Sequence, residues 1–194
     1  MTLSKRNGYY YRNGREYVSV TKFLGETIAK PAIQYWYARE AVRVALKNPE
    51  MNEKEVMAQV QLDVSKTQGR GKYIHSLAEV MPDVDEKTVK EEFKGYFKAL
   101  KSWWAKENPE RLYTEQEAYS DRFGYACRTD LVYLKEGITF VADFKTGKNF
   151  YSETGLQLAA NRNALIEDGF IKDGKMIAVI LTETGEYITK ETND

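Results

Sequence analysis

The segment at 130–147, DLVYLKEGITFVADFKTG, constrains the fold more than any other part of the chain. Apolar residues alternate with polar ones on both sides of a central Glu-Gly, which is the pattern of two strands joined by a two-residue turn. Counting outward from this turn sets Asp130 directly opposite Asp143. Lys145 lies two residues beyond Asp143 and therefore on the same face of the strand. The segment predicts a hairpin that carries two acids and a lysine on one face.

Two carboxylates on opposed β-carbons about 5 Å apart repel by roughly 3 kcal/mol at an effective dielectric of about 20. The repulsion becomes attraction if a hard divalent cation lies between them, since Mg²⁺ and Mn²⁺ prefer carboxylate oxygens. Such a cation neutralises a phosphate and lowers the pKa of a bound water, while the lysine orients that water, so the hairpin predicts a centre that hydrolyses phosphodiesters. The alternative is a solvated hairpin, because Glu-Gly is a weaker turn than Asn-Gly and the register could slip by one.

Composition excludes several other classes of protein. The 194 residues fit one domain, and 42% apolar with 30% charged residues describes a globular chain without an apolar stretch long enough for a membrane span. A single cysteine, Cys127, excludes an internal disulfide and a cysteine-held iron-sulfur cluster within one chain. Any metal must therefore sit on oxygen or on the one histidine. We expect a cytoplasmic protein, of a bacterial or phage-infected cell, with no membrane partner.

The charges are distributed unevenly along the chain. The net charge is zero, but residues 1–48 hold nine Lys/Arg and three Asp/Glu, a surplus of six, and residues 151–194 hold four and eight, a deficit of four. Tyrosines and a tryptophan are interleaved with the basic residues, and a cation beside a flat ring suits single-stranded nucleic acid. The alternative is that these rings pack in the core and that the charges are solvated helix faces.

Periodicity and breakers predict a mixed α/β chain. The predicted helices are 19–30, 31–47, 52–66, one from about 70, 85–108 and 152–168, and the predicted strands are 112–120, 124–135, 138–145, 176–181 and 186–189. The order gives a mixed central sheet with a β-meander and a crossing helix, plus an N-terminal helical lobe. We expect one domain at 1–194, with a mainly helical lobe at 1–108 and a catalytic α/β core at 109–194.

These motifs carry a resemblance to a known family. Asp130, followed thirteen positions later by Asp-Phe-Lys at 143–145, resembles the signature of the PD-(D/E)XK nuclease superfamily. The blocks SVTKFL, GRGKYIHSLAE, EAYSDRFGYACRTDLV, VADFKTGK and LQLAA occur in the order used by its RecB-like branch, and are similar to the mitochondrial genome maintenance exonuclease type. The similarity covers most of the chain from Ser19 onward. It implies a restriction-endonuclease-like core around a Mg²⁺ or Mn²⁺ centre.

The resemblance assigns roles to residues of the hairpin. It implies that Asp130 and Asp143 bind the metal, that Phe144 contributes its backbone carbonyl, and that Lys145 serves the attacking water. It also implies that Glu117, on the preceding strand, reaches the metals directly or through water.

Three further positions bear on the same predicted centre. Glu115 is a rival to Glu117 on the same strand face, and we prefer Glu117 for its spacing to the following glycine. His75 is expected at the edge of the metal centre, although a lone histidine on a helix is more often structural. Gln157 matches the glutamine of a glutamine-x-x-x-tyrosine motif, but Asn161 stands where the tyrosine is usual, so the contact made by that tyrosine is in doubt.

The sequence thus predicts a metal-dependent DNA nuclease, most simply an exonuclease on single strands or DNA ends, with recombination or replication proteins as partners. The alternatives are a catalytically silent nuclease-fold module that binds nucleic acid, and a phosphatase for small molecules. The predicted substrate contacts are Arg39 and Arg43, which share one helix face, with Arg70, Lys72, Lys148, Tyr35 and Trp36.

Overall fold

The hairpin forms with the predicted register. In the computed structural model, which describes residues 7–29 and 31–192, strand β4 (Tyr125–Lys135) pairs antiparallel with β5 (Ile138–Thr146). Lys135 lies opposite Ile138, and Leu131 lies opposite Ala142. Both residues of the turn have positive φ, 51° and 78°, as a tight two-residue turn requires. This register carries Asp130 and Asp143 to opposed positions.

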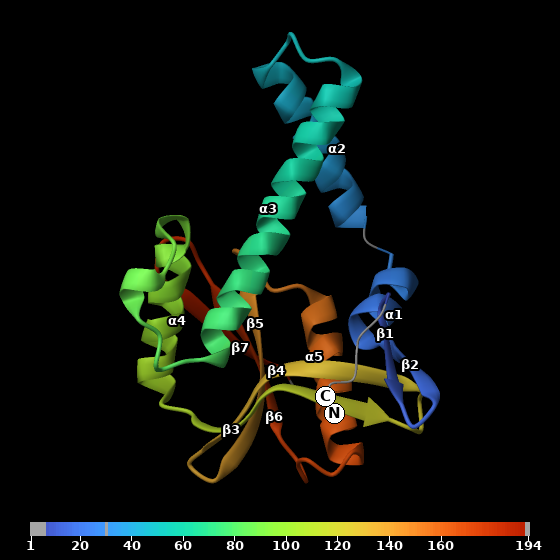
Figure 1. The fold of residues 1–194 in the computed structure, drawn as a ribbon, viewed down its shortest axis with the longest axis vertical. Helices are drawn as coiled ribbons and strands as arrows, with labels where there is room; N and C mark the ends of the chain where they lie inside the picture. The colour runs from blue at the N-terminus through green and yellow to red at the C-terminus, as the bar shows by residue number, and fades with distance from the viewer. Residues whose placement is uncertain (1–6, 30, 193–194) are drawn as a thin grey trace.

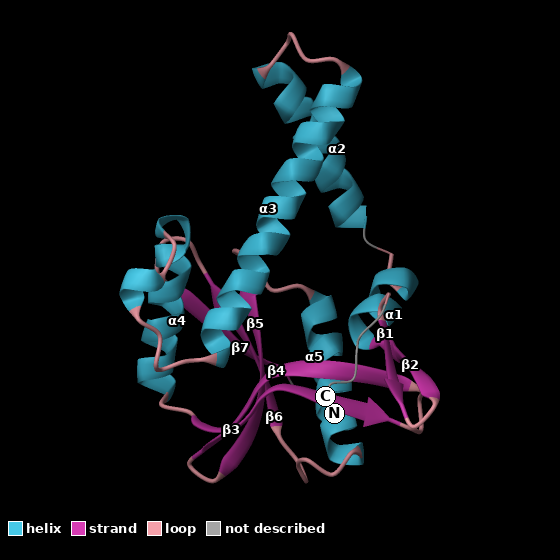
Figure 2. Cartoon of the chain, in the orientation of Figure 1, coloured by secondary structure: helices cyan, strands magenta, loops and turns pink. Residues whose placement is uncertain are grey.

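The strands form one seven-stranded mixed sheet, and the prediction of a mixed α/β fold is confirmed (Figures 1 and 2). Its order is β1-β2-β4-β5-β6-β7, with β3 on the other side of β4. The remaining strands are β1 (Tyr9–Arg12), β2 (Arg15–Ser19), β3 (Glu110–Ser120), β6 (Lys175–Leu181) and β7 (Tyr187–Thr192). The helices are α1 (Val20–Thr27), α2 (Pro31–Lys47), α3 (Glu53–Glu79), α4 (Lys94–Glu107) and α5 (Ser152–Glu167). No helix in the described part of the chain is long and apolar enough to cross a bilayer.

The edge of β4 that faces away from β3 has two partners. At its start, β2 pairs in parallel with Tyr125 and Ala126, and at its end β5 pairs with residues 131–135. Strand β3 occupies the opposite edge along nearly the whole of β4. Residues 127–130 of β4 therefore face a fork between β2 and β5, where neither strand covers the edge. This fork positions the candidate site.

The two faces of the sheet are covered by different helices. Helix α4 and the end of α3 pack on one face, where Phe144 lies in the core with its ring centroid 5.2 Å from that of Trp103. Helices α1 and α5 cover the other face, where Val141 and Leu158 are fully buried. Since alternate residues of β5 point to opposite faces, Asp143 lies on the α5 side.

Helices α2 and α3 form an arm that projects from the sheet (Figure 1). They pack together near the tip through Val44, Val56 and Val60. The sequence predicted a break between two helices near residue 67, which is wrong, because α3 runs unbroken for 27 residues. Two glycines near its middle weaken the helix without ending it, and its last turns are anchored in the core.

The helical lobe is also less helical than predicted. Residues 9–19 form the hairpin β1–β2, which joins the sheet. Its turn is Asn13-Gly14, with φ of 52° and 77°. Asn-Gly between alternating residues is a strong hairpin signal, so this element was available from the sequence. The helix predicted from residue 85 begins only at Lys94, after two short 3₁₀ turns at 86–88 and 91–93.

Substitution of Gly69 by alanine tests the continuity of α3. Gly69 is exposed in the helix interior, and an added Cβ would meet no atom within 4 Å. Gly69→Ala should therefore raise the free energy of unfolding by about 1 kcal/mol in urea denaturation. Gly95→Ala is the opposite control, because its Cβ would clash with the backbone carbonyl of Glu183 and should destabilise the protein. A helix broken near residue 69 would show no gain from Gly69→Ala.

Candidate active site

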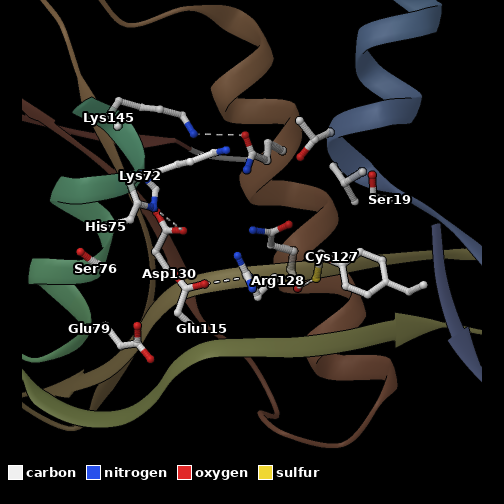
Figure 3. Close-up of a pocket in the computed structure, with 16 residues that line it drawn as sticks. Ser19, Lys72, His75, Ser76, Glu79, Glu115, Cys127, Arg128, Asp130 and Lys145 are labelled. Carbon is white, nitrogen blue, oxygen red and sulfur yellow. Dashed lines mark hydrogen bonds and ion pairs between the residues drawn. The ribbon is translucent and has the colours of Figure 1, made fainter. Parts of the chain in front are cut away.

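The fork opens into a cavity of about 480 Å³ (Figure 3). Strands β1 to β5 line it together with α3, α5 and the start of α1. Its lining residues are Tyr10, Ser19, Val20, Thr21, Gly71, Lys72, His75, Ser76, Glu79, Glu115, Cys127, Arg128, Asp130, Lys145, Gln157 and Asn161. Four residues predicted from the sequence for the catalytic centre, Asp130, Lys145, Gln157 and His75, therefore line a single cavity.

Three ligand-type side chains converge at one end of this cavity. One ligand atom each of His75, Glu115 and Asp130 lies within 4.8 Å of the other two. His75 Nδ1 lies 3.3 Å from Asp130 Oδ1. Helix α3 supplies the histidine from its last turns, while neighbouring strands supply the two acids. Figure 3 shows the three side chains side by side.

Asp130 links this cluster to the hairpin. Its Oδ2 accepts a hydrogen bond of 2.8 Å from the backbone N–H of Phe144. The ring of Phe144 points into the core on the other face of the sheet. The backbone of Phe144 therefore reaches the cluster through its amide, whereas the role of its carbonyl as a metal ligand stays a prediction.

Asp143 is held by the lysine of the same strand. It is 1% exposed, and Lys145 Nζ lies 2.9 Å from its Oδ1 and 2.7 Å from its Oδ2. Lys145 also donates to Oε1 of Gln157 on α5 at 3.3 Å. The prediction that Lys145 shares a face with Asp143 is confirmed. Asp143 is not one of the three clustered ligands, and its carboxylate is paired with Lys145.

The two opposed acids have different protonation equilibria. Burial raises the pKa of Asp143 to about 6, with Lys145 opposing and Asp130 reinforcing the shift. Burial also acts to raise the pKa of Asp130, but the hydrogen bond and charge of His75 outweigh it and lower that pKa below its usual value. Burial disfavours the charged form of Lys145, yet Asp143 and Asp130 raise its pKa, so the lysine is protonated at neutral pH.

The donor set suits a hard divalent cation. Two carboxylates and one imidazole offer oxygen and nitrogen ligands of the kind that Mg²⁺ and Mn²⁺ accept. Asp143 adds a buried carboxylate beside the cluster, and its Oδ2 lies 2.7 Å from the ammonium of Lys145. These residues therefore fit a metal centre.

The structure places Glu115, and not Glu117, in the cluster. Thr114 pairs with Leu131 and Gln116 with Thr129, which sets Glu115 across from Asp130. Glu117 lies outside the cavity lining, and its Oε2 accepts a hydrogen bond from the Tyr119 hydroxyl at 3.3 Å. The preference for Glu117 is therefore corrected. Glu115 has φ of 48°, so the regular alternation of the strand does not hold at this residue.

Arg128 is a site residue that the sequence analysis missed. Its Nε lies 2.7 Å from Oε2 of Glu115, and its side chain is 56% exposed at the cavity. Arg128 precedes Asp130 by two residues on β4, so strand alternation would have placed both on one face. Burial raises the pKa of Glu115, and the nearby guanidinium opposes this shift.

The predicted substrate contacts lie at different distances from the cluster. Lys72 lines the cavity beside His75. Arg70 lies outside the lining, with its guanidinium 5.0 Å from the Tyr96 ring and Nε 3.4 Å from the Thr146 hydroxyl. Lys148 is exposed in the connection between β5 and α5. Only Lys72 of these three contributes to the cavity wall.

The remaining predicted contacts, Tyr35, Trp36, Arg39 and Arg43, lie on α2 in the arm. Arg39 lines a surface groove with Thr67 of α3. Thr67 precedes His75 by eight residues, which is about 12 Å along the helix. The arm residues therefore do not join the cavity, and they would contact a substrate only at a distance from it.

Comparison with known proteins leaves the family of the chain unassigned. No family model and no curated protein matches it. Among solved structures it is similar to the one described as the crystal structure of SSO0001, with 17% identity and a TM-score of 0.36. The match covers 79% of this chain and 62% of that protein, so the chain spans about three-fifths of the length of SSO0001. The resemblance to nucleases stays a prediction from the motifs.

The pKa of His75 predicts a pH dependence of stability in metal-free protein. Burial acts to lower this pKa, but the hydrogen bond and charge of Asp130 raise it to about 8. A raised pKa stabilises the folded state below the unfolded value of about 6.5, and this contribution is lost as pH rises through 8. The shift corresponds to about 2 kcal/mol.

Urea denaturation in EDTA at pH 6.5 and 9 should show most of this loss in the wild type. His75 is the only histidine in the sequence, so no other imidazole contributes. His75→Gln is the control and should remove this component of the pH dependence. An equal fall in both proteins would mean that the His75–Asp130 pair is not formed in solution.

Proposed function

We propose that this protein is a metal-dependent nuclease that hydrolyses phosphodiester bonds at DNA ends, with Mg²⁺ or Mn²⁺ as cofactor. The observation that carries the proposal is the convergence of His75, Glu115 and Asp130 beside the Asp143–Lys145 pair in one cavity. Structural ion pairs do not need three metal-type ligands within 4.8 Å of one another. A bound cation would neutralise the phosphate and activate water at neutral pH.

The residues of the site would have two roles, holding the cation and orienting the attacking water. His75, Glu115 and Asp130 would hold the cation, and Asp143 would supply a further carboxylate oxygen. Lys145, cationic and fixed by Asp143 and Gln157, points its ammonium into the cavity. There it would neutralise charge on the phosphate and orient the attacking water.

The shape of the site supports action on ends rather than recognition of base sequence. Reading base pairs requires an element that enters a groove, whereas the catalytic residues here lie inside a cavity in the sheet. Two further cations, Lys72 and Arg128, flank the cluster and would contact phosphates of the strand. Recombination or replication proteins as partners belong to the same proposal.

Release of labelled nucleotides separates this proposal from its rivals. DNA strands labelled at the 5′ or 3′ end, single and double stranded, are digested with Mn²⁺ or with EDTA. Terminal release that requires Mn²⁺ supports an exonuclease. Binding without cleavage would indicate a silent nucleic-acid-binding module, and cleavage of a small phosphomonoester with DNA left intact would indicate a phosphatase.

The paired glutamates of β3 test the catalytic assignment. Glu115→Gln should lower kcat on DNA at least about 100-fold, as removal of a metal ligand does, and should weaken Mn²⁺ binding in calorimetry. Glu117→Gln, two residues along the same strand and outside the cavity, is the matched control and should retain both. The reverse result would restore Glu117 as the ligand and overturn the placement of Glu115.

The arm offers a second matched pair, Arg39 and Arg43. Arg43 is already paired with Glu40, whereas no ion pair of Arg39 occurs among the described residues. If α2 touches a single strand, Arg39→Ala should make the slope of log affinity against log salt shallower by about 0.7, one phosphate contact. Arg43→Ala should change it less. Wild-type slopes in both variants would show that this face of α2 does not contact the strand.

A further inference from the structure

The cavity has a second side that the metal cluster does not use. His75, Asp130 and Lys145 lie on one side, and Ser19, at the start of α1, lies across from them (Figure 3). This second side carries the motif SVTKFL at 19–24 and the residue Asn161, which replaces the expected tyrosine. The nuclease chemistry assigns no role to either.

Helix α1 begins at the wall of the cavity. Val20 and Thr21 in its first turn line the cavity, and Ser19 caps the helix by accepting a hydrogen bond from the N–H of Lys22. An α-helix leaves its first backbone N–H groups without partners inside the helix, and its N-terminus carries a partial positive charge. The first turn contains no acid that would offset this charge. The cavity therefore has a helix N-terminus, with its partial positive charge, in its wall.

Asn161 independently points to a polar ligand. It is 2% exposed and lines the same cavity from α5, yet its side-chain amide makes no hydrogen bond to any described residue. Buried amides of native proteins normally have hydrogen-bond partners. An amide that lines the same cavity as the helix N-terminus adds an N–H donor for the same ligand. An acceptor-rich ligand would satisfy both.

Two further lining residues, Cys127 and Tyr10, are neutral. Burial raises the pKa of Cys127 to about 12, so its thiol is uncharged at neutral pH. Burial likewise raises the pKa of Tyr10 to about 12 and keeps the phenol protonated. An anion on this side would meet no thiolate or phenolate from these two residues.

We propose that the α1 side of the cavity binds the terminal phosphomonoester of a nucleic-acid strand, which rests on the proposed nuclease function. Donors would come from the first turn of α1 and from the Asn161 amide, a common arrangement for phosphate at a helix N-terminus. A volume of about 480 Å³ falls within the range of small-ligand sites, about 300–1,000 Å³. The terminal nucleotide would bridge this phosphate subsite and the metal cluster, so that cleavage occurs one nucleotide from the end.

A terminal phosphate could belong to the 5′ or the 3′ end of the strand, and binding measurements distinguish the two. The probes are internally labelled 12-nucleotide single strands that carry a 5′-phosphate, a 3′-phosphate or only hydroxyl ends. Anisotropy is measured in EDTA, where no cleavage occurs. The wild type should prefer one phosphorylated strand over the hydroxyl strand about tenfold, the size expected for charge-assisted hydrogen bonds at a helix N-terminus.

Two substitutions should remove this preference. Asn161→Asp places a carboxylate against the phosphate and should reduce the ratio to about twofold or less. Asn163→Asp is the matched control, because Asn163 lies two residues along α5 and is exposed. Thr21→Glu should have the same effect as Asn161→Asp, and an acid in the first turn favours the helix, so this variant keeps its fold.

The outcomes separate the subsite from the nuclease. Equal binding of all three strands by the wild type, or a preference that survives both Asn161→Asp and Thr21→Glu, overturns the phosphate subsite. A preference lost in these variants and kept in Asn163→Asp supports it. If that preference is found but no strand is cleaved with Mn²⁺, the subsite stands and the nuclease proposal fails.

Discussion

The carboxylate of Asp130 joins the three parts of the structure on which the site depends. Its Oδ2 accepts a hydrogen bond of 2.8 Å from the backbone N–H of Phe144 on the other strand of the hairpin. Its Oδ1 lies 3.3 Å from Nδ1 of His75, in the last turns of α3 where the arm meets the sheet. A slip of one residue in the hairpin would turn Asp130 to the other face of the sheet. The slip is opposed by the core, because Phe144 is buried against Trp103 on that face. Apolar packing on one face of β5 thus fixes the polar geometry on the other.

The same register explains why two opposed acids do not destabilise the hairpin. The sequence alone suggested mutual repulsion that only a metal would relieve. In the folded chain, Lys145 forms an ion pair with Asp143, and His75 forms one with Asp130. Each carboxylate therefore has its own cationic partner. The two pKa values nevertheless move in opposite directions, because burial outweighs Lys145 at Asp143 and raises that pKa, whereas His75 helps to lower the pKa of Asp130. The fold therefore does not require a cation, and a cation bound by His75 would displace the proton that this imidazole carries at neutral pH.

The sequence alone predicted the features that depend on residues close together in the chain. Strand alternation and a two-residue turn predicted the hairpin register and the shared face of Asp143 and Lys145, and both are confirmed. The choice between Glu115 and Glu117 failed because alternation gives them the same face, and only the unusual φ of Glu115 separates them. The fork in β4 depends on parallel pairing of Ser19 with Ala126, two residues far apart in the chain. No local pattern encodes that pairing.

Part of the basic charge near the N-terminus is used for ion pairs within the fold. Arg12 lies 2.6 Å from Asp168, and Arg12 and Arg15 both pair with Asp121, so part of the basic surplus joins the β1–β2 hairpin to acids later in the chain. Three of the other cations, Lys72, Arg128 and Lys145, line the cavity, whereas Arg39 lies on α2 outside it. A field confined to a cavity attracts one or two phosphates rather than a long backbone. Under the proposed function, a chain of zero net charge would hold a strand chiefly by its end.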